Sequence, residues 1–193
     1  MTQPPVILAS TSAYRAALLR RLLDTFTQEA PGTDEAPVGG EAPANRAARL
    51  AEAKARAVAA ANPGSVVIGS DQVADLNGTV LDKPGTAHAA HTQLEASSGQ
   101  EVIFHTAVCV IDTQGQAHVH VDETRVRFRT LSHGDITRYV ERERPLDCAG
   151  SFKCEGLGIS LFERIANVDP TALVGLPLIA TSHLLRSAGI ALP

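Results

Sequence analysis

The sequence contains no tryptophan and only 4% aromatic residues, so alanine, leucine, valine and isoleucine must fill the core. Its cysteines, Cys109, Cys148 and Cys154, are odd in number and form no CxxC pair, which argues against a disulfide framework and a zinc site of that type. No apolar run approaches the about 20 residues that cross a bilayer. Residues 1–5 lack the basic start and apolar block of a signal peptide. We therefore expect a cytoplasmic protein without a membrane partner.

The length of 193 residues is enough for one good core, divided at most into two lobes, so we expect a single domain over residues 1–193. Hydrophobic residues make up 44% and charged residues 20% of the chain, as in soluble globular proteins. The net charge of −4 and the lack of an aromatic–basic stripe argue against binding to nucleic acid. A phosphate site requires only that a few arginines and lysines converge locally.

A β-branched run at Val66–Ile68 predicts a strand buried on both faces, which ends at Gly69. Asp71 follows, and the ends of such strands open onto ligand-binding crevices. A carboxylate there can hold a divalent metal or take a proton from water. Lys83 lies beyond an Asn77–Gly78 turn, so the chain can return its ammonium toward the acid. This pairing is typical of nucleotide hydrolysis, although a strand-end acid and a hairpin lysine can also be purely structural.

The N-terminal segment reads as a short strand, Val6–Ala9, followed by a helix over Ala16–Leu23. Serine is a favoured N-cap, so the helix is expected to begin between Ser10 and Ser12. A strand that runs into a helix N-terminus presents free backbone N–H groups to an anion, and Arg15 would add a charge-assisted contact. An ordinary capped helix with a surface arginine is the alternative.

The remaining pattern predicts alternating loops, helices and strands. We expect a loop over 25–43, a helix over 44–61, a helix over 86–98, strands 101–112 and 118–130 in an antiparallel hairpin, and a helix over 133–142. Residues 158–165 could form a strand or a helix, of which we favour the strand, and a turn from 171 leads into a closing helix that ends near 187. The charged residues of helix 44–61, Arg46 among them, are expected to form mostly a solvated face.

Two histidines in the predicted helix 86–98, His88 and His91, are three residues apart. They could share a metal, but we expect no carboxylate or third histidine at a matching spacing. We therefore interpret them as a surface pair.

Several motifs, taken together, resemble the Maf family of nucleoside triphosphate pyrophosphatases. The segment LASTSAYR (8–15) is similar to the family's LASxSPxR opening, and GSDQ (69–72) with KP (83–84) matches its Asp-centred strand and turn. SG (98–99), Tyr139, AGSF (149–152) and VGLP (174–177) follow in the family's order. One departure is Ala13, where a proline is usual; the helix does not require it.

This resemblance implies hydrolysis of a nucleoside triphosphate between the α- and β-phosphates, with a divalent metal, Mg²⁺ or Mn²⁺. It implies an α/β fold in which a mixed twisted sheet is flanked by helices and two lobes enclose a cleft. Asp71 matches the general base or metal carboxylate, and Glu35 matches a second acid near the metal. The matches to the phosphate-binding groups are Ser10, Ser12, Arg15, Lys54 and Lys83.

Three positions depart together from the common family pattern: Tyr14, Gln72 and Glu155. The combination resembles the subfamily that hydrolyses 7-methyl-GTP, in which the first position is typically aromatic. The chemistry agrees, because N7-methylation makes guanine cationic and a cation stacks well on an aromatic face such as Tyr14. Glu155 can accept hydrogen bonds from the guanine N1–H and N2–H groups, which a pyrimidine does not offer in that arrangement.

Two alternatives stay open at this point. Within the family, the chain could hydrolyse dTTP, UTP or a broader set of modified nucleotides. From another class, it could be a non-catalytic regulator linked to septum formation, but the joint presence of Glu35, Lys54, Asp71 and Lys83 favours catalysis. The sequence leaves open whether Glu35 or Asp71 activates the water. It also leaves open whether the protein, whose expected partner is a small-molecule nucleotide substrate, is a homodimer.

Overall fold

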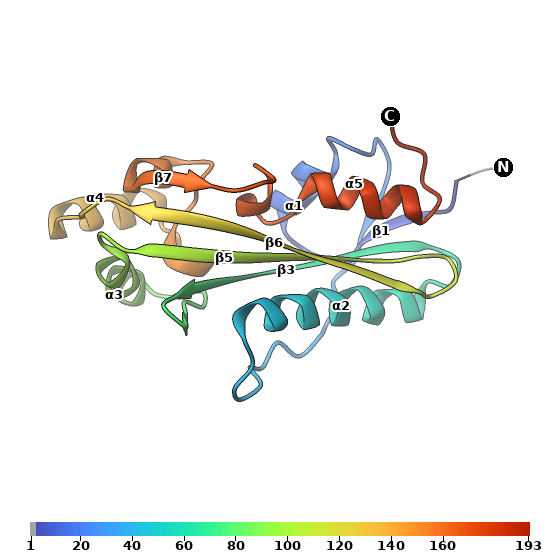
Figure 1. Cartoon of the computed structure of the whole chain (residues 1–193), viewed down its shortest axis with the longest axis horizontal. Helices are drawn as coiled ribbons and strands as arrows, with labels where there is room; N and C mark the ends of the chain where they lie inside the picture. Colours follow the sequence, from blue (N-terminus) through green and yellow to red (C-terminus); the bar gives the residue numbers. More distant parts are fainter. Residues whose placement is uncertain (1–2) are drawn as a thin grey trace.

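The computed structural model describes residues 3–193 and contains a mixed sheet flanked by helices (Figure 1). Within these residues the strands are β1 (Val6–Leu8), β2 (Thr27–Gln28), β3 (Val66–Leu76), β4 (Thr79–Val80), β5 (Glu101–Ile111), β6 (Ala117–Phe128) and β7 (Phe162–Ala166). The helices are α1 (Ala13–Leu19), α2 (Pro43–Ala61), α3 (Ala87–Ser97), α4 (His133–Glu143) and α5 (Leu178–Ser187), with short 3₁₀ helices η1 (Ala149–Ser151), η2 (Leu157–Leu161) and η3 (Ala172–Val174).

The sheet has the strand order β2-β1-β3-β5-β6-β7, and β4 pairs with β3 on the same side as β1. Strand β1 is parallel to β2 and β3, whereas β3, β5, β6 and β7 form successive antiparallel pairs. The predicted mixed α/β fold is therefore confirmed. None of the helices in residues 3–193 is both long and apolar enough to cross a membrane.

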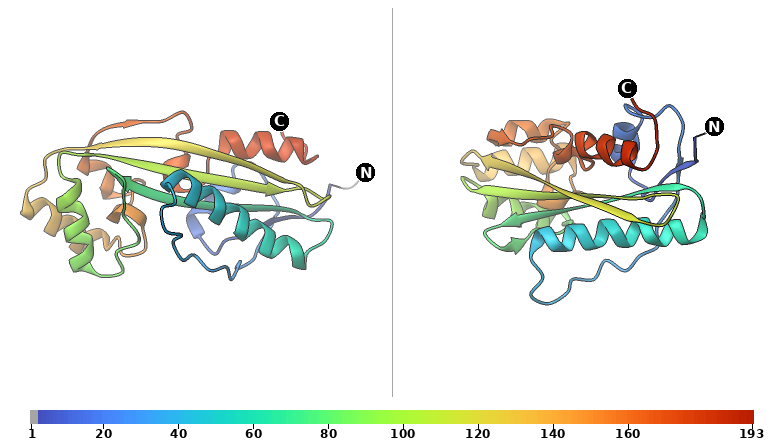
Figure 2. Two further views of the ribbon diagram at one scale, coloured as in Figure 1. Left: turned by 60° about the horizontal axis from the view of Figure 1, so that its bottom comes forward. Right: turned by 45° about the vertical axis from the view of Figure 1, so that its right-hand side comes forward.

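The helices gather in two groups along the long strands (Figures 1 and 2). Helix α2 covers one face of β3 and β5, while α1 and α5 pack against the opposite face at the same end of the sheet. Helices α3 and α4 pack together at the other end, over an apolar cluster centred on Phe104 and Phe128. The two groups are the lobes that the family resemblance implied.

Glycine at position 69 lets α2 approach β3 closely. A Cβ atom there would lie 2.2 Å from the Ala51 carbonyl oxygen and 2.7 Å from the Ala55 backbone nitrogen. Any larger residue would have to push the helix away from the strand, because interiors are too densely packed to absorb it. The contact sets the position of Lys54, which lies between these two alanines on α2.

Most predicted elements are confirmed, including the helix 43–61, the long β5–β6 hairpin and α4. Ser12 is the N-cap of α1, as expected, and Ser132 forms a capping box with Asp135 at the start of α4. The closing helix begins at Leu178, directly after Pro177, which serves as its N-cap.

Three predicted boundaries are wrong. Strand β3 continues past Gly69 to Leu76, because β5 pairs with it along that whole length. Helix α1 ends at Leu19 rather than Leu23, since the chain must turn to bring the unpredicted strand β2 beside β1. The expected strand 158–165 begins only at Phe162, after η2.

Candidate active site

The candidate site is a cavity beside a gap in the edge pairing of β3. On one edge, β1 pairs with residues 66–68 of β3 and β4 pairs with residues 75–76. Between these pairings lies a cavity of about 1020 Å³ that contains Asp71 and Gln72 in its lining. Neighbouring residues of a strand point to opposite faces, so an open edge is what allows both side chains to reach one cavity. The crevice therefore lies at an interruption in edge pairing, not at the strand end that the sequence predicted.

All ten side chains predicted for the site line this cavity. They are Ser10, Ser12, Tyr14, Arg15, Glu35, Lys54, Asp71, Gln72, Lys83 and Glu155. They come from the β1–α1 junction, the loop before α2, α2 itself, β3, the loop after β4 and the segment after η1. Residues separated by most of the chain are thus brought to one place.

A buried ammonium joins the two acids at the inner end of the cavity. Lys54 Nζ lies 2.6 Å from Asp71 Oδ1 and 2.7 Å from Glu35 Oε1. The side chains of Lys54 and Asp71 are only 7% and 10% exposed, whereas that of Glu35 is 51% exposed. Partial burial alone would raise the pKa of Glu35, but the hydrogen bond and charge of Lys54 outweigh it and lower the pKa below its ordinary value.

Arg15 is held in place by the backbone before α5. Its Nε donates to the Gly175 carbonyl oxygen at 2.9 Å, and the Ser70 hydroxyl donates to the same oxygen at 2.9 Å. Gly175 has φ +121°, in the region that side chains other than glycine rarely adopt. Desolvation lowers the pKa of Arg15, yet arginine stays charged at neutral pH. The guanidinium is thus a fixed cation beside the two acids.

The two serines of the opening motif organise the entry to α1. The Ser12 hydroxyl accepts from the Arg15 backbone N–H at 3.3 Å, and the Ser10 hydroxyl accepts from the Ser12 backbone N–H at 3.1 Å. Both residues line the cavity, so their hydroxyl groups can still donate to a ligand.

A further cation, Arg46, was missed by the sequence prediction, which placed it on a solvated face. Its side chain is 13% exposed, forms an ion pair with Asp82 at 3.0 Å and lines the cavity. The signal that could have identified it is spacing, because Arg46, Leu50 and Lys54 follow at i, i+4 and i+8 on one face of α2. Arg46 Nε and Thr33 Oγ1 are both buried without a hydrogen-bond partner among the described residues.

Lys83 lies on the exposed loop after β4 and lines the cavity. Its charge contributes to the lowered pKa of Glu35, which places the two side chains in electrostatic range. The β3–β4 hairpin therefore brings Lys83 to the same cavity as the two acids.

The outer end of the cavity combines an aromatic ring with carboxylates. Tyr14 is 36% exposed, and desolvation raises the pKa of its phenol. Among its charged neighbours, Lys153 lowers that pKa, whereas Glu155 and Asp147 raise it, and Lys153 forms an ion pair with Asp147 at 3.6 Å. Asp147 lines the cavity as well and was not predicted from the sequence. This mouth presents an aromatic face and two acids to whatever enters it.

The amide nitrogen of Gln72 is hydrogen-bonded within the protein. Nε2 donates to the carbonyl oxygens of Ala172 and Leu173, each at 3.1 Å, and contacts Thr106 Oγ1 at 2.9 Å. The amide oxygen is the atom left to meet a ligand, so Gln72 can serve as an acceptor of hydrogen bonds but not as a donor.

Helix α4 supports the segment that carries Glu155. The Tyr139 hydroxyl accepts from the Lys153 backbone N–H at 2.9 Å, and Glu143 Oε1 accepts from the Leu157 backbone N–H at 3.1 Å. Gly158 packs so tightly that a Cβ there would lie 2.4 Å from the Lys153 carbonyl oxygen. The backbone around Glu155 is therefore fixed, although its side chain is exposed.

Two thiols in the cavity wall are poor candidates for a covalent mechanism. Burial raises the pKa values of Cys148 and Cys154 to about 12. Since the thiolate is the nucleophile, neither sulfur is reactive near neutral pH. The carboxylates of Asp71 and Glu35 are groups that can take a proton from water or bind a divalent cation.

Comparison with known proteins places these observations in a family. The model of the family described as Maf-like protein matches residues 5–188. A protein of Xanthomonas oryzae pv. oryzae named 7-methyl-GTP pyrophosphatase is 58% identical over 98% of this chain and 100% of its own length. One of the same name from Aromatoleum aromaticum is 54% identical over 100% of both chains.

Solved structures extend the likeness to the fold alone. The Ham1 protein of Staphylococcus aureus superposes with a TM-score of 0.53 at 12% identity, covering 95% of this chain and 98% of that one. A HAM1 protein from Coxiella burnetii gives the same TM-score, 0.53, at 14% identity over 96% and 100% of the two chains.

Proposed function

Because this chain belongs to the Maf family, we propose that it hydrolyses 7-methyl-GTP to 7-methyl-GMP and pyrophosphate. The full-length relatives at 54% and 58% identity carry that activity in their names. The observation in this chain that supports it best is the cavity mouth, where Tyr14 lies beside Glu155 and Asp147. The reaction would remove a modified nucleotide from the free nucleotide pool. Since that pool is cytoplasmic, we propose that the protein acts in the cytoplasm.

The inner acids suit the hydrolytic step. Asp71 is the buried carboxylate on the central strand, and in this proposal it accepts the proton of the attacking water. Glu35 and Asp71 offer the oxygen ligands that Mg²⁺ and Mn²⁺ prefer, and both carboxylates contact Lys54 Nζ, so they lie close to each other. When bound there, a divalent cation would neutralise charge that develops on the phosphate oxygens.

The cations around these acids suit a triphosphate. Arg15, Lys54 and Lys83 line the inner cavity, and Arg46 adds a fourth positive charge. Fixed cations stabilise the charge that moves onto leaving pyrophosphate, without a reorganisation step at the moment of reaction. The hydroxyl groups of Ser10 and Ser12 can donate to the phosphate oxygens beside Arg15. The unpartnered Arg46 Nε and Thr33 Oγ1 are further groups that a bound phosphate or ribose could satisfy.

The outer end suits a cationic purine. A 7-methylguanine ring carries positive charge, which the Tyr14 face and the carboxylates of Glu155 and Asp147 would attract. Glu155 can accept from the guanine N1–H and N2–H groups, and the free oxygen of Gln72 is an additional acceptor. In this proposal no side chain has to donate a hydrogen bond to the base edge. This agrees with the Gln72 amide nitrogen, which already donates its hydrogen bonds within the protein.

The test is pyrophosphate release by the purified protein with Mg²⁺ or Mn²⁺ on 7-methyl-GTP, GTP, dTTP, UTP and ITP. We expect 7-methyl-GTP to have the highest kcat/KM, with one pyrophosphate and one 7-methyl-GMP formed per substrate. A preference for dTTP or UTP would retain the hydrolase and overturn the base assignment. Failure to hydrolyse any of the five by folded, metal-supplied protein would overturn the proposed function and favour a regulatory role.

A further inference from the structure

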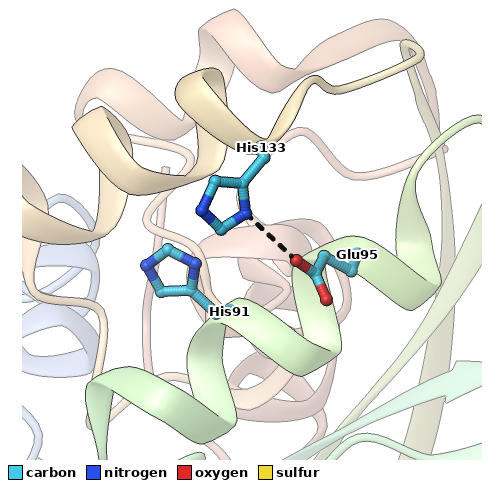
Figure 3. Close-up of side chains that lie close together, drawn as sticks. All are labelled: His91, Glu95 and His133. Carbon is cyan, nitrogen blue, oxygen red and sulfur yellow. Dashed lines mark hydrogen bonds and ion pairs between the residues drawn. The ribbon is translucent and has the colours of Figure 1, made fainter.

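Three metal-binding side chains meet on the surface between α3 and α4, away from the cavity. His91 and Glu95 project from α3, and His133 is the first residue of α4 (Figure 3). One donor atom from each of the three lies within 4.8 Å of the others. His133 Nδ1 is 3.4 Å from Glu95 Oε1, and the two imidazole centroids are 5.7 Å apart. None of the three residues lines the active-site cavity.

This cluster corrects the interpretation of the histidines in α3. The sequence prediction paired His91 with His88 and expected no third ligand at a matching spacing. In the fold, Glu95 lies one helical turn after His91 on the same face, and α4 supplies His133 from 42 positions further along the chain than His91. The side chains come together only because α3 and α4 pack against each other.

We propose that His91, Glu95 and His133 bind a transition-metal ion, with Zn²⁺ as the expected occupant. Two imidazole nitrogens and one carboxylate oxygen form a donor set that suits Zn²⁺, and water would complete a tetrahedral site. Such a set differs from the all-oxygen ligands proposed in the cavity, which suit Mg²⁺ or Mn²⁺. This inference does not depend on the proposed nucleotide chemistry.

The geometry can close around an ion with small side-chain movements. Zinc ligands lie about 2.0–2.2 Å from the metal, so the donor atoms must approach one another more closely than their present spacing. The side chains of His133 and Glu95 are 77% and 55% exposed, which leaves room for these rotations. Glu95 also lies in the last turn of α3, where the helix dipole disfavours a carboxylate and a bound cation would offset that effect.

A metal here would join two helices that each support a wall of the active site. On α3, the Gln93 side chain donates to the Asp82 carbonyl oxygen at 2.8 Å and accepts from the Ser151 hydroxyl at 2.5 Å. On α4, Tyr139 holds the backbone of Lys153. We therefore expect Zn²⁺ to stabilise the α3–α4 end of the molecule.

The first experiment titrates Zn²⁺ into the full-length protein by calorimetry, without Mg²⁺ or nucleotide. The variants are His91→Ala, His133→Ala and the double variant, with His88→Ala as the matched control on the exposed face of the same helix. We expect a site in the wild type that the single variants weaken at least tenfold and the double variant abolishes, while His88→Ala binds as the wild type does. Equal binding by the double variant, or no zinc binding by the wild type, would overturn the proposal.

A second readout separates this site from zinc bound at the acids or thiols of the cavity. Thermal unfolding followed by circular dichroism should show that Zn²⁺ raises the Tm of the wild type and of Asp71→Asn, but not that of the His91→Ala/His133→Ala variant. The gain should vanish at mildly acidic pH, because metal binding requires neutral imidazoles. A Tm gain that survives in the double variant would assign the metal elsewhere. Spectra of the metal-free variants establish that they are folded.

Discussion

The two ends of the active-site cavity are built in different ways. At the inner end, Lys54 and Asp71 are 7% and 10% exposed, and their positions follow from the contact of α2 with β3 at Gly69. At the outer end, Tyr14 is 36% exposed and Glu155 is also exposed. The glycine-rich segment at the outer end is held by hydrogen bonds from α4 as well as by packing on the core.

This difference separates two tasks. Groups that stabilise developing charge are effective when they are fixed and shielded from water, as at the inner end. Groups that choose between bases need only bind one base better than another, and an exposed rim can do so. We therefore expect changes at the inner end to lower the rate for every nucleotide, and changes at the outer end to alter the order of preference.

The largest predicted effect is that of Asp71→Asn. The amide cannot take a proton from water, and the loss of a preorganised charged group typically lowers kcat by about 10²–10³. Steady-state pyrophosphate release measures the loss. Asp75→Asn, the same change four residues along β3 and outside the cavity lining, is the matched control and should leave kcat unchanged. An Asp71→Asn enzyme with wild-type kcat would remove this residue from the mechanism.

A smaller effect is expected for Glu155→Gln at the outer end. The hydrogen bonds of Glu155 to N1–H and N2–H are open to both guanine bases, whereas its negative charge attracts only the cationic 7-methylguanine. An exposed pair of opposite charges is worth about 0.2–1 kcal/mol, so the preference for 7-methyl-GTP over GTP should fall by about fivefold or less. The ratio of the two kcat/KM values measures it. Glu163→Gln, an exposed glutamate on β7, should leave the ratio unchanged. Unaltered selectivity in Glu155→Gln would show that the base is recognised by other groups.

Tyr139→Phe tests the support of the outer end rather than its contacts. The variant removes the acceptor of the Lys153 N–H while keeping the buried ring. One hydrogen bond contributes about 1 kcal/mol, so selectivity should fall by about fivefold or less, with kcat on GTP retained. The check is the same ratio of kcat/KM values. If kcat on GTP fell in parallel, the two ends would be mechanically coupled and the comparison would fail.

The smallest effect concerns Asp122, a buried acid that, unlike Asp71 with Lys54, forms no ion pair among the described residues. Asp122 on β6 is buried, and its Oδ1 has no hydrogen-bond partner among the described residues. Burial raises its pKa above the ordinary 3.8, and the charge of Asp169 adds to the shift. The folded protein then binds this proton more tightly than the unfolded chain, so stability decreases as pH rises through that window.

Asp122→Asn should therefore raise the Tm at neutral pH, and its advantage should shrink as the pH falls toward 3.8. Thermal melts across this range measure the difference, and kcat should not change because Asp122 does not line the cavity. A variant that is less stable than the wild type at neutral pH would mean that the carboxylate is favourable where it lies.

The sequence was sufficient to name ten residues that line one cavity, but not to show how the fold assembles them. The motif around Asp71 marked the central strand, and the family order linked it to Lys83 and Glu35. The gap between β1 and β4 could not be predicted, because it depends on long-range pairing that leaves no local pattern. Glu35, in a segment that looked solvated, is drawn in by an ion pair with Lys54.

Residues with no local signal were missed for the same physical reason. Asp147 lies in an irregular segment, and its proximity to Tyr14 depends on how the fold places that segment near α1. The group formed by His91, Glu95 and His133 joins two helices and is visible only once they pack. Arg46 alone could have been found, by following the spacing of Lys54 back along α2.

The most direct test of the two-ended account is kcat/KM on 7-methyl-GTP and on GTP for the wild type, Asp71→Asn and Glu155→Gln. We predict that Asp71→Asn lowers both values by the same factor, so that their ratio is preserved. Glu155→Gln should lower the value for 7-methyl-GTP more than that for GTP, so that their ratio falls. A change of ratio in Asp71→Asn, or an equal loss on both nucleotides in Glu155→Gln, would contradict the division of the cavity into a reacting end and a base-selecting end.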